Sequence, residues 1–138
     1  MNNKLQKMAL ANKNAGNEIY FKTTKTNQQI LIVNYCKNQT MLCFIVDQNK
    51  LKKVASLKYL ITKADATIHL PKLDVCKEYQ FINIGTNMVL CLQDYAKKLG
   101  LKKIILNSLS PSLEFYQKLG FNQTAIVEDF VYTCDKQL

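Results

Sequence analysis

The sequence predicts one α/β domain over residues 1–138, and three features lead to this prediction. Residues 68–99 form a strand pattern, then a loop, then an amphipathic helix pattern. Residues 41–47 and 54–62 are apolar, β-branched runs separated by a polar turn, a pattern typical of an antiparallel hairpin. The chain has 138 residues and is 48% hydrophobic, so it is long enough to form one folded core.

The strand at the start of the stretch 68–99 changes face in its middle. Ile68 and Leu70 are in step with each other, as are Leu73 and Val75, but the two pairs are out of step by one residue. Because side chains in a strand alternate between its faces, this slip requires an extra residue. We therefore predict a β-bulge at Pro71-Lys72, where the proline already lacks an N–H group for the ladder.

Residues 80–86 form the predicted loop in front of the helix. Asn83 and Gly85 can take a positive φ and bring backbone N–H groups close to a ligand. The helix then runs from Met88 to Leu99, and a glycine follows it. Free N–H groups and the positive end of the helix dipole suit phosphate oxygens. The loop is therefore a candidate anion-binding site, with a plain β–α turn as the alternative.

Two motifs in this order resemble the GNAT family of N-acetyltransferases. Leu73-x-Val75 followed by Gln80-x-x-Asn83-x-Gly85 is similar to the family's Q/R-x-x-G-x-G/A acetyl-CoA loop. Residues 115–121, Phe-Tyr-Gln-Lys-Leu-Gly-Phe, resemble its F-Y-x-K-x-G-F ending. The resemblance covers residues 41–134 and implies a GNAT-type (acyl-CoA N-acyltransferase) fold. In that fold a mixed, mostly antiparallel sheet is splayed at the bulged strand, with helices on both faces.

The resemblance implies that acetyl-CoA is the cosubstrate. The amides of Leu73 and Val75 would bind the thioester carbonyl and the pantetheine, and the loop 80–86 would bind the pyrophosphate. Asn107, at the end of its strand, would contact the pantetheine arm. Lys118 would contact a CoA phosphate, with a solvated lysine as the alternative. The predicted cofactor-binding residues are Leu73, Asp74, Val75, Gln80, Phe81, Ile82, Asn83, Ile84, Gly85, Thr86, Asn107, Tyr116 and Lys118.

Tyr116 and His69 are the candidates for catalytic proton transfer. Tyr116 matches the family tyrosine that often protonates the departing CoA thiolate, with a core aromatic as the alternative. His69 is the only histidine and stands four residues before Leu73, where the histone-acetylating branch of the family has a glutamate base. Histidines titrate near neutral pH and can deprotonate an ammonium group, although the alternative is a structural histidine. Asp74 and Glu78 are further base candidates, with solvated carboxylates as their alternative.

The resemblance implies acetyl transfer to a primary amine by direct attack, without a covalent enzyme intermediate. The sequence does not specify the acceptor, which is either a small molecule or a protein. Asn83 stands where the family most often has its first glycine, and Leu109 where many members have an asparagine. These departures leave an alternative, a weakly active or inactive GNAT-like protein that binds CoA as a sensor or scaffold.

Charge, cysteine content and hydropathy indicate the partners, the metal content and the location of the protein. The net charge of +9 indicates an anionic partner, which is the CoA phosphates, an acidic protein, a nucleic acid or a membrane surface, with a solvated lysine-rich surface as the alternative. The lack of an aromatic-and-basic motif argues against nucleic acid. The five cysteines are odd in number and lack C-x-x-C spacing, which predicts reduced thiols, a cytoplasmic location and no metal site. No apolar run is long enough to span a membrane. We expect a monomer or a homodimer without a membrane anchor.

The other elements follow from local patterns. The apolar run in residues 29–36 suits either a buried strand or a buried helix. We expect a helix there, because the resemblance implies one between the first two strands. The remaining predictions are a helix at 2–14, a strand at 19–23, a strand at 103–107, a helix capped by Ser110 with Pro111 at its first position and ended by Gly120, and strands at 124–127 and 130–134.

Overall fold

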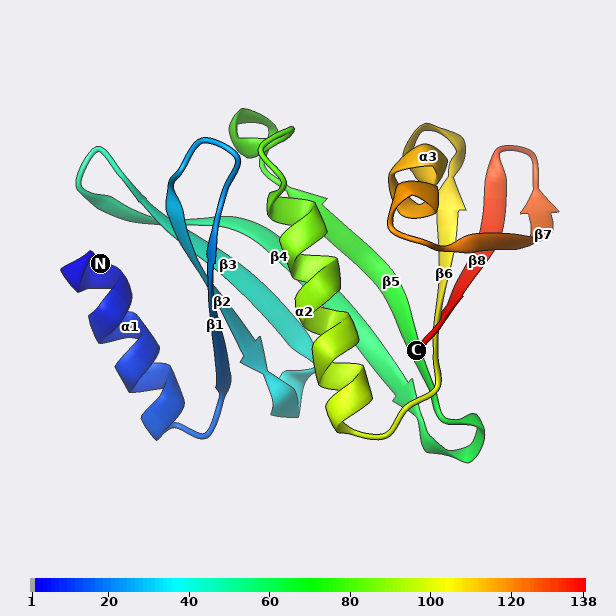
Figure 1. Cartoon of the computed structure of the whole chain (residues 1–138), viewed down its shortest axis with the longest axis horizontal. Helices are drawn as coiled ribbons and strands as arrows, with labels where there is room; N and C mark the ends of the chain where they lie inside the picture. Colours follow the sequence, from blue (N-terminus) through cyan, green and yellow to red (C-terminus); the bar gives the residue numbers. More distant parts are fainter. Residues whose placement is uncertain (1) are drawn as a thin grey trace. The chain divides into compact units, whose positions relative to one another are not determined.

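The computed structural model describes residues 2–138 (Figure 1). Three short 3-10 helices, Cys36–Asn38, Lys63–Asp65 and Lys77–Tyr79, lie between the regular elements. The helices and strands in chain order are α1 (Asn3–Asn14), β1 (Glu18–Thr23), β2 (Gln29–Tyr35), β3 (Thr40–Asp47), β4 (Lys50–Thr62), β5 (Thr67–Val75), α2 (Ile84–Lys98), β6 (Lys103–Leu109), α3 (Ser110–Lys118), β7 (Asn122–Glu128) and β8 (Val131–Gln137).

The strands form one mixed sheet in the order β1-β2-β3-β4-β5-β6-β8-β7. The pairs β1–β2, β2–β3, β3–β4, β6–β8 and β7–β8 are antiparallel, and β5–β6 is parallel. This arrangement confirms the predicted mixed, mostly antiparallel sheet. The chain divides into two compact units, one made of residues up to Lys58 with Lys72–Cys91, the other of Tyr59–Pro71 with Leu92–Leu138.

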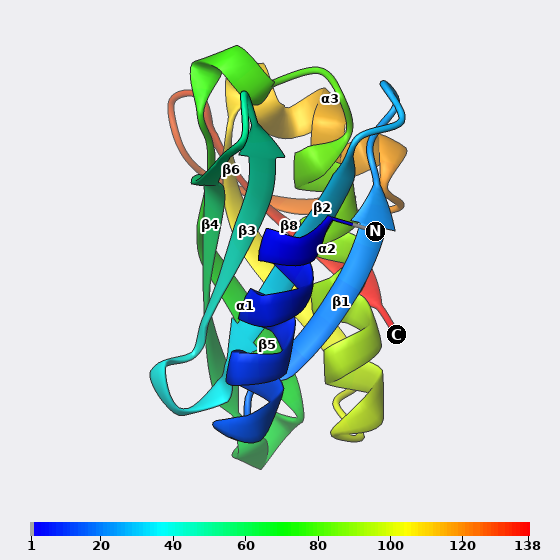
Figure 2. The ribbon, with the colours of Figure 1, turned by 90° about the vertical axis from the view of Figure 1, so that its left-hand side faces the viewer.

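In the first unit, α1 covers a face of the strands β1 to β3 (Figure 2). The helix begins after Asn2, whose side chain accepts a hydrogen bond of 2.8 Å from the N–H of Lys4. Leu5 and Ala9 are spaced one helical turn apart and are both buried. They pack into an apolar cluster with Leu31, Val33 and Phe44. The N-terminal helix therefore helps to form the core of this unit, and the helix predicted at residues 2–14 is confirmed.

The helix expected over residues 29–36 is wrong, because these residues form strand β2. This strand pairs with β1 on one side and β3 on the other, and residues 30–33 are all 0% exposed. A strand that is buried on both faces has apolar side chains at consecutive positions, so the usual alternation is missing. The chain then enters β3 through the 3-10 turn Cys36–Asn38 and not through a helix.

In the second unit, β6 pairs with β8 along its whole length, from Lys103 opposite Gln137 to Leu109 opposite Val131. The helix α3 follows β6 directly. Its N-cap is Leu109, so the expected cap at Ser110 is wrong by one residue, and Pro111 is the second residue of the helix, not the first as expected. The chain leaves α3 through Gly120, whose φ of +92° favours glycine.

The strand β5 shows the change of face that its sequence predicts. Ile68 and Leu70 are buried, and the next two residues, Pro71-Lys72, are both exposed. Leu73 and Val75 are then half-buried. Two successive exposed residues break the alternation at the predicted position. The bulge itself stays a prediction.

Candidate active site

The pairing between β5 and β6 ends partway along both strands. Three parallel pairs join them, and the last is His69 opposite Ile105. Both strands extend beyond this point, β5 to Val75 and β6 to Leu109. The sheet therefore has unpaired strand edges immediately after His69.

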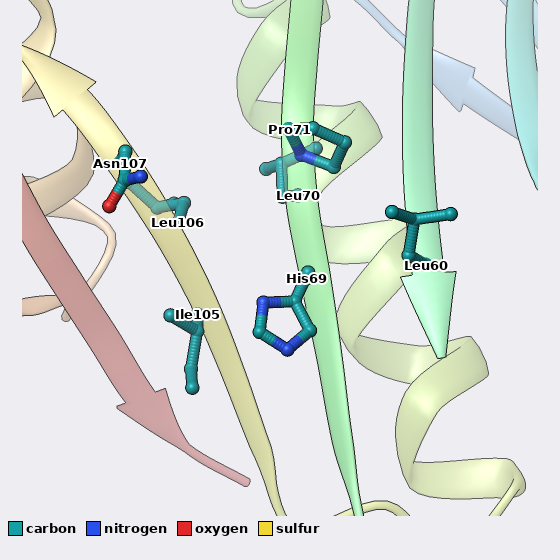
Figure 3. Close-up of a pocket in the computed structure, with 7 residues that line it drawn as sticks. All are labelled: Leu60, His69, Leu70, Pro71, Ile105, Leu106 and Asn107. Carbon is teal, nitrogen blue, oxygen red and sulfur yellow. The ribbon is translucent and has the colours of Figure 1, made fainter. Parts of the chain in front are cut away.

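A pocket of about 300 Å³ lies at this position in the second unit (Figure 3). His69 and Ile105 are half-buried and come from the last matched pair, so they are neighbours across the pocket. Leu70 and Leu106 are both buried, and each is 3% exposed. The full lining is Leu60, His69, Leu70, Pro71, Ile105, Leu106 and Asn107.

The pocket brings together two residues that the sequence proposed for separate roles, His69 as a base and Asn107 as a cofactor contact. The Asn107 Oδ1 atom accepts a hydrogen bond of 3.1 Å from the Thr133 hydroxyl. This contact leaves the N–H groups of the Asn107 amide to donate to a ligand carbonyl. An imidazole that can accept a proton therefore lines the same pocket as an amide that can donate hydrogen bonds.

Sequence reasoning missed Leu60 and Ile105 as pocket residues. Leu60 is 54% exposed on β4, whereas most apolar residues of the central strands are buried. The alternation of side chains along β4 predicts that the Leu60 side chain points outward. Nothing else in the nearby sequence indicates that this residue lines a pocket. Ile105 comes from a nearly continuous apolar run, 104–106, which does not distinguish a pocket wall from the core.

In the first unit, the end of β5 presents backbone amides at one edge. The N–H of Cys76 donates a hydrogen bond of 2.8 Å to the carbonyl of Val54 in β4. Because successive N–H groups in a strand point to opposite edges, those of Leu73 and Val75 point away from β4. These are the two amides that the sequence predicted to bind the cofactor. Asp74 forms an exposed ion pair with Lys72, at 3.3 Å.

The predicted cofactor loop is shorter than expected, since α2 begins at Ile84 and the loop proper is residues 80–83. Asn83 takes a left-handed conformation with φ of +65°, as expected, whereas Gly85 lies in the helix as its second residue. The first intrahelical bond runs from the Asn87 N–H to the Asn83 carbonyl, at 3.0 Å. The N–H groups of residues 84–86 therefore have no acceptor within the helix and can receive an anion.

Hydrogen bonds fix the shape of this loop. The Gln80 side chain donates to the Val75 carbonyl at 3.0 Å, which ties the loop to the end of β5. The N–H of Lys25, in the β1–β2 turn, contacts both the Ile82 carbonyl at 3.2 Å and the Asn83 Oδ1 atom at 3.1 Å. The backbone is thus held in place from two sides before any ligand binds. Phe81, which lies between these anchors, has a φ of +66° and is 93% exposed.

A tyrosine just before the loop adds a further anchor. The hydroxyl of Tyr79 donates a hydrogen bond of 2.6 Å to the carboxylate of Asp47, at the end of β3. This hydrogen bond, with burial of the phenol as a smaller cause, raises the pKa of Tyr79 to about 12. The phenol is therefore neutral throughout the physiological range and acts here as a hydrogen-bond donor.

Tyr116 and Lys118 lie on α3 and do not line the pocket. The ring of Tyr116 makes edge-to-face contacts with Phe115 and Phe121, at centroid distances of 5.0 and 5.7 Å. These contacts hold the ring in place. Lys118 forms an exposed ion pair with Glu114 at 3.1 Å, a contact too exposed to fix the side chain strongly.

A family model described as an acetyltransferase (GNAT) domain matches residues 11–131. The chain belongs to the GNAT acetyltransferase family. This match covers most of the chain and includes the β5 edge, the loop before α2 and the pocket. None of the curated proteins matches the sequence of this GNAT domain.

Solved structures share the fold of this GNAT domain at low sequence identity. The PaiA N-acetyltransferase from Thermoplasma acidophilum, in complex with coenzyme A, is 20% identical with a TM-score of 0.61, over 72% of this chain and 60% of that one. A domain from Methanocaldococcus jannaschii is 17% identical with a TM-score of 0.63, over 72% and 66%. Naa50 from Arabidopsis thaliana, in complex with the bisubstrate analogue CoA-Ac-MVNAL, is 21% identical with a TM-score of 0.59, over 73% and 74%. The matched part is thus less than two thirds of the length of the first two proteins.

Residues 2–138 contain neither a metal-binding cluster nor a membrane-spanning helix. No group of three or more His, Cys, Asp or Glu side chains in this part of the chain is placed to hold a metal ion. Among the described helices, none is both long enough and apolar enough to cross a bilayer. All five cysteines are free thiols, and burial raises the pKa of the Cys43 thiol to about 12.

Proposed function

We propose that this GNAT domain transfers the acetyl group of acetyl-CoA to a primary amine by direct attack. The observation that carries the proposal is the pocket at the end of the β5–β6 pairing, which holds His69 and Asn107 together. The family assignment supplies the reaction class. The pocket supplies a proton acceptor and a hydrogen-bond donor in one place.

The reaction requires a neutral amine, a polarised carbonyl and a stable leaving group. An imidazole nitrogen of His69 accepts the proton of the acceptor's ammonium group, and the freed amine attacks the thioester carbon. The backbone amides of Leu73 and Val75 donate to the developing oxyanion and to the pantetheine. The attacking nitrogen then loses its second proton to water and the carbon–sulfur bond breaks; Tyr116 protonates the departing CoA thiolate and is itself reprotonated from solvent. The products are an N-acetylated amine and free CoA.

The loop before α2 binds the pyrophosphate in this proposal. The N–H groups of residues 84–86 lack acceptors within the helix, and the loop is anchored through Gln80, Ile82 and Asn83. A site whose backbone is already fixed loses less entropy when it binds a ligand. Asn107 contacts the pantetheine arm, which carries amide carbonyls. Lys118 adds positive charge for a CoA phosphate.

The free thiols support a reducing compartment, and we place the protein in the cytoplasm.

The experiment is to incubate the full chain with acetyl-CoA and a panel of amines, and to measure both thiol release and the N-acetylated product by mass spectrometry. We expect stoichiometric release of CoA and formation of an acetylated amine. Calorimetry with acetyl-CoA alone provides the binding constant independently. Tight binding without turnover on any amine would indicate the alternative, a CoA-binding sensor or scaffold. Leu109, which stands where many family members have an asparagine, is the departure that supports this alternative.

A further inference from the structure

The chemistry of the pocket restricts the acceptor beyond "a primary amine". Of the seven described residues that line it, five are aliphatic or proline, one is an imidazole and one is an amide. None of these lining side chains carries a carboxylate. We propose that the pocket binds an acceptor whose amine is attached to an apolar group, and that it discriminates against polyamines. This inference rests on the proposed function, because it assigns the acceptor of that reaction.

The first argument is electrostatic. A polyamine is a polycation, and a site selective for it needs carboxylates to replace the water around its ammonium groups. The lining residues offer none, and the protein carries a net charge of +9. A polycation would therefore be repelled by the protein as a whole and would find no counter-ion in the pocket.

The second argument concerns the apolar surface. Leu60 is a large aliphatic side chain that is 54% exposed at the pocket, and the exposed Pro71 lines the same pocket. An aliphatic or aromatic group placed over Leu60 and Ile105 would remove apolar surface from water, which favours binding. A polar or charged group at the same position would lose hydration without gaining a hydrogen bond.

The third argument is the position of the proton acceptor. His69 lies between Leu60 on β4 and Ile105 on β6, because β5 is the middle strand of the three (Figure 3). An amine attached to a short apolar group can bring its nitrogen to the imidazole while its carbon atoms cover the aliphatic walls. A pocket of about 300 Å³ has room for such a molecule and is at the small end for ligand sites.

The test measures binding at the pocket without relying on turnover. The full chain, labelled with ¹⁵N, is titrated with 3-methylbutylamine, leucinamide and spermidine, and the amide signals of His69, Ile105 and Leu106 are followed by NMR. We expect 3-methylbutylamine or leucinamide to shift these signals at a concentration about 10-fold or more below the concentration of spermidine that is needed for the same shift. Leucinamide binding more tightly would indicate an amino-terminal residue as the acceptor. 3-Methylbutylamine binding more tightly would indicate a free small amine.

A matched pair of variants sharpens the result. Leu60→Asp places a carboxylate at the pocket and should reverse the preference in favour of spermidine. Leu51→Asp makes the same change at another exposed leucine of β4 that does not line the pocket, and it should leave the preference unchanged.

Two results would overturn the inference: tighter binding of spermidine to the parent protein, or no shift of the pocket signals with either monoamine. If the monoamines bind at the pocket but no acetylated product forms with acetyl-CoA, the ligand class holds and the proposed transfer reaction fails.

Discussion

The side-chain oxygen of Asn83 accepts a hydrogen bond of 3.1 Å from the backbone N–H of Lys25. Asn83 stands where the GNAT motif most often has glycine, so its side chain raised the question of whether it obstructs the cofactor. The contact directs that side chain to the β1–β2 turn, and the backbone still takes the left-handed conformation, with φ of +65°. Asparagine thus keeps the backbone shape that a glycine would have and adds a tertiary hydrogen bond.

This contact predicts different effects for two substitutions at position 83. Asn83→Gly loses the hydrogen bond but accepts a positive φ, so the free energy of unfolding should fall by about 1 kcal/mol. Asn83→Ala loses the same bond and adds the cost of a left-handed alanine, for a total of about 2 kcal/mol. Urea denaturation of both variants measures the difference. Equal stability of the alanine variant and the parent would show that the Lys25 contact contributes nothing.

Gly85→Glu tests the pyrophosphate site. The substitution places a carboxylate in the first turn of α2, where it is compatible with the helix dipole but repels the CoA phosphates. We expect a folded protein whose affinity for acetyl-CoA falls at least about 100-fold, the size of several lost charge-assisted contacts. Leu90→Glu, at a 39% exposed position on the same helix, is the control and should bind normally. Calorimetry decides, and normal binding by Gly85→Glu would remove the loop from the proposed site.

His69→Gln tests the proposed base. Glutamine keeps a polar side chain in the pocket but cannot accept the proton, so the rate at neutral pH should fall about 100-fold. The rate should recover at alkaline pH, because the amine then deprotonates without help. The affinity for acetyl-CoA serves as the control and should not change. A variant with the parental rate and the parental pH profile would make His69 a structural residue and leave water as the base.

Tyr116→Phe separates the phenol from the ring. The edge-to-face contacts with Phe115 and Phe121 are kept, so the stability should change little. If the hydroxyl protonates the thiolate, kcat should fall about 100-fold with unchanged affinity for acetyl-CoA. Tyr132→Phe, on β8, is the matched control and should remain active. Full activity of Tyr116→Phe would leave Tyr116 with a packing role only.

Tyr79→Phe should lower stability in a way that depends on pH. The hydrogen bond to Asp47 raises the pKa of Tyr79 from 10.0 to about 12, so the folded protein holds this proton more tightly than the unfolded chain does. The stabilisation is therefore complete below pH 10 and is lost as the pH rises toward 12. At neutral pH the variant should be less stable by about 1.5 kcal/mol, the size of a hydrogen bond to a charged group. Denaturation of both proteins from pH 7 to 11.5 measures the difference, and a gap that does not narrow above pH 10 would contradict the assignment.

The local patterns of the chain were sufficient for most elements and for the family. The hairpin β3–β4, the strand β5 and the helix α2 follow from alternation, helical spacing and turn residues, which depend on neighbours within a few positions. The break in alternation at Pro71-Lys72 was predictable because the apolar side chains of β5 shift there from even to odd positions, and both of these residues are exposed. The order of two motifs then pointed to the GNAT family, which the match over residues 11–131 confirms.

Tertiary structure decided what local patterns leave open. Residues 30–33 are a strand because partners on both sides satisfy their backbone and bury both faces, and no periodicity within the run records those partners. Asn83 became an anchor because Lys25, far away in the sequence, offers it an N–H. The pocket exists because the β5–β6 pairing ends at His69, which brings Leu60, His69 and Asn107 together from three strands. Each of these depends on where one strand lies against another, and the sequence alone fixes only which residues are available for those contacts.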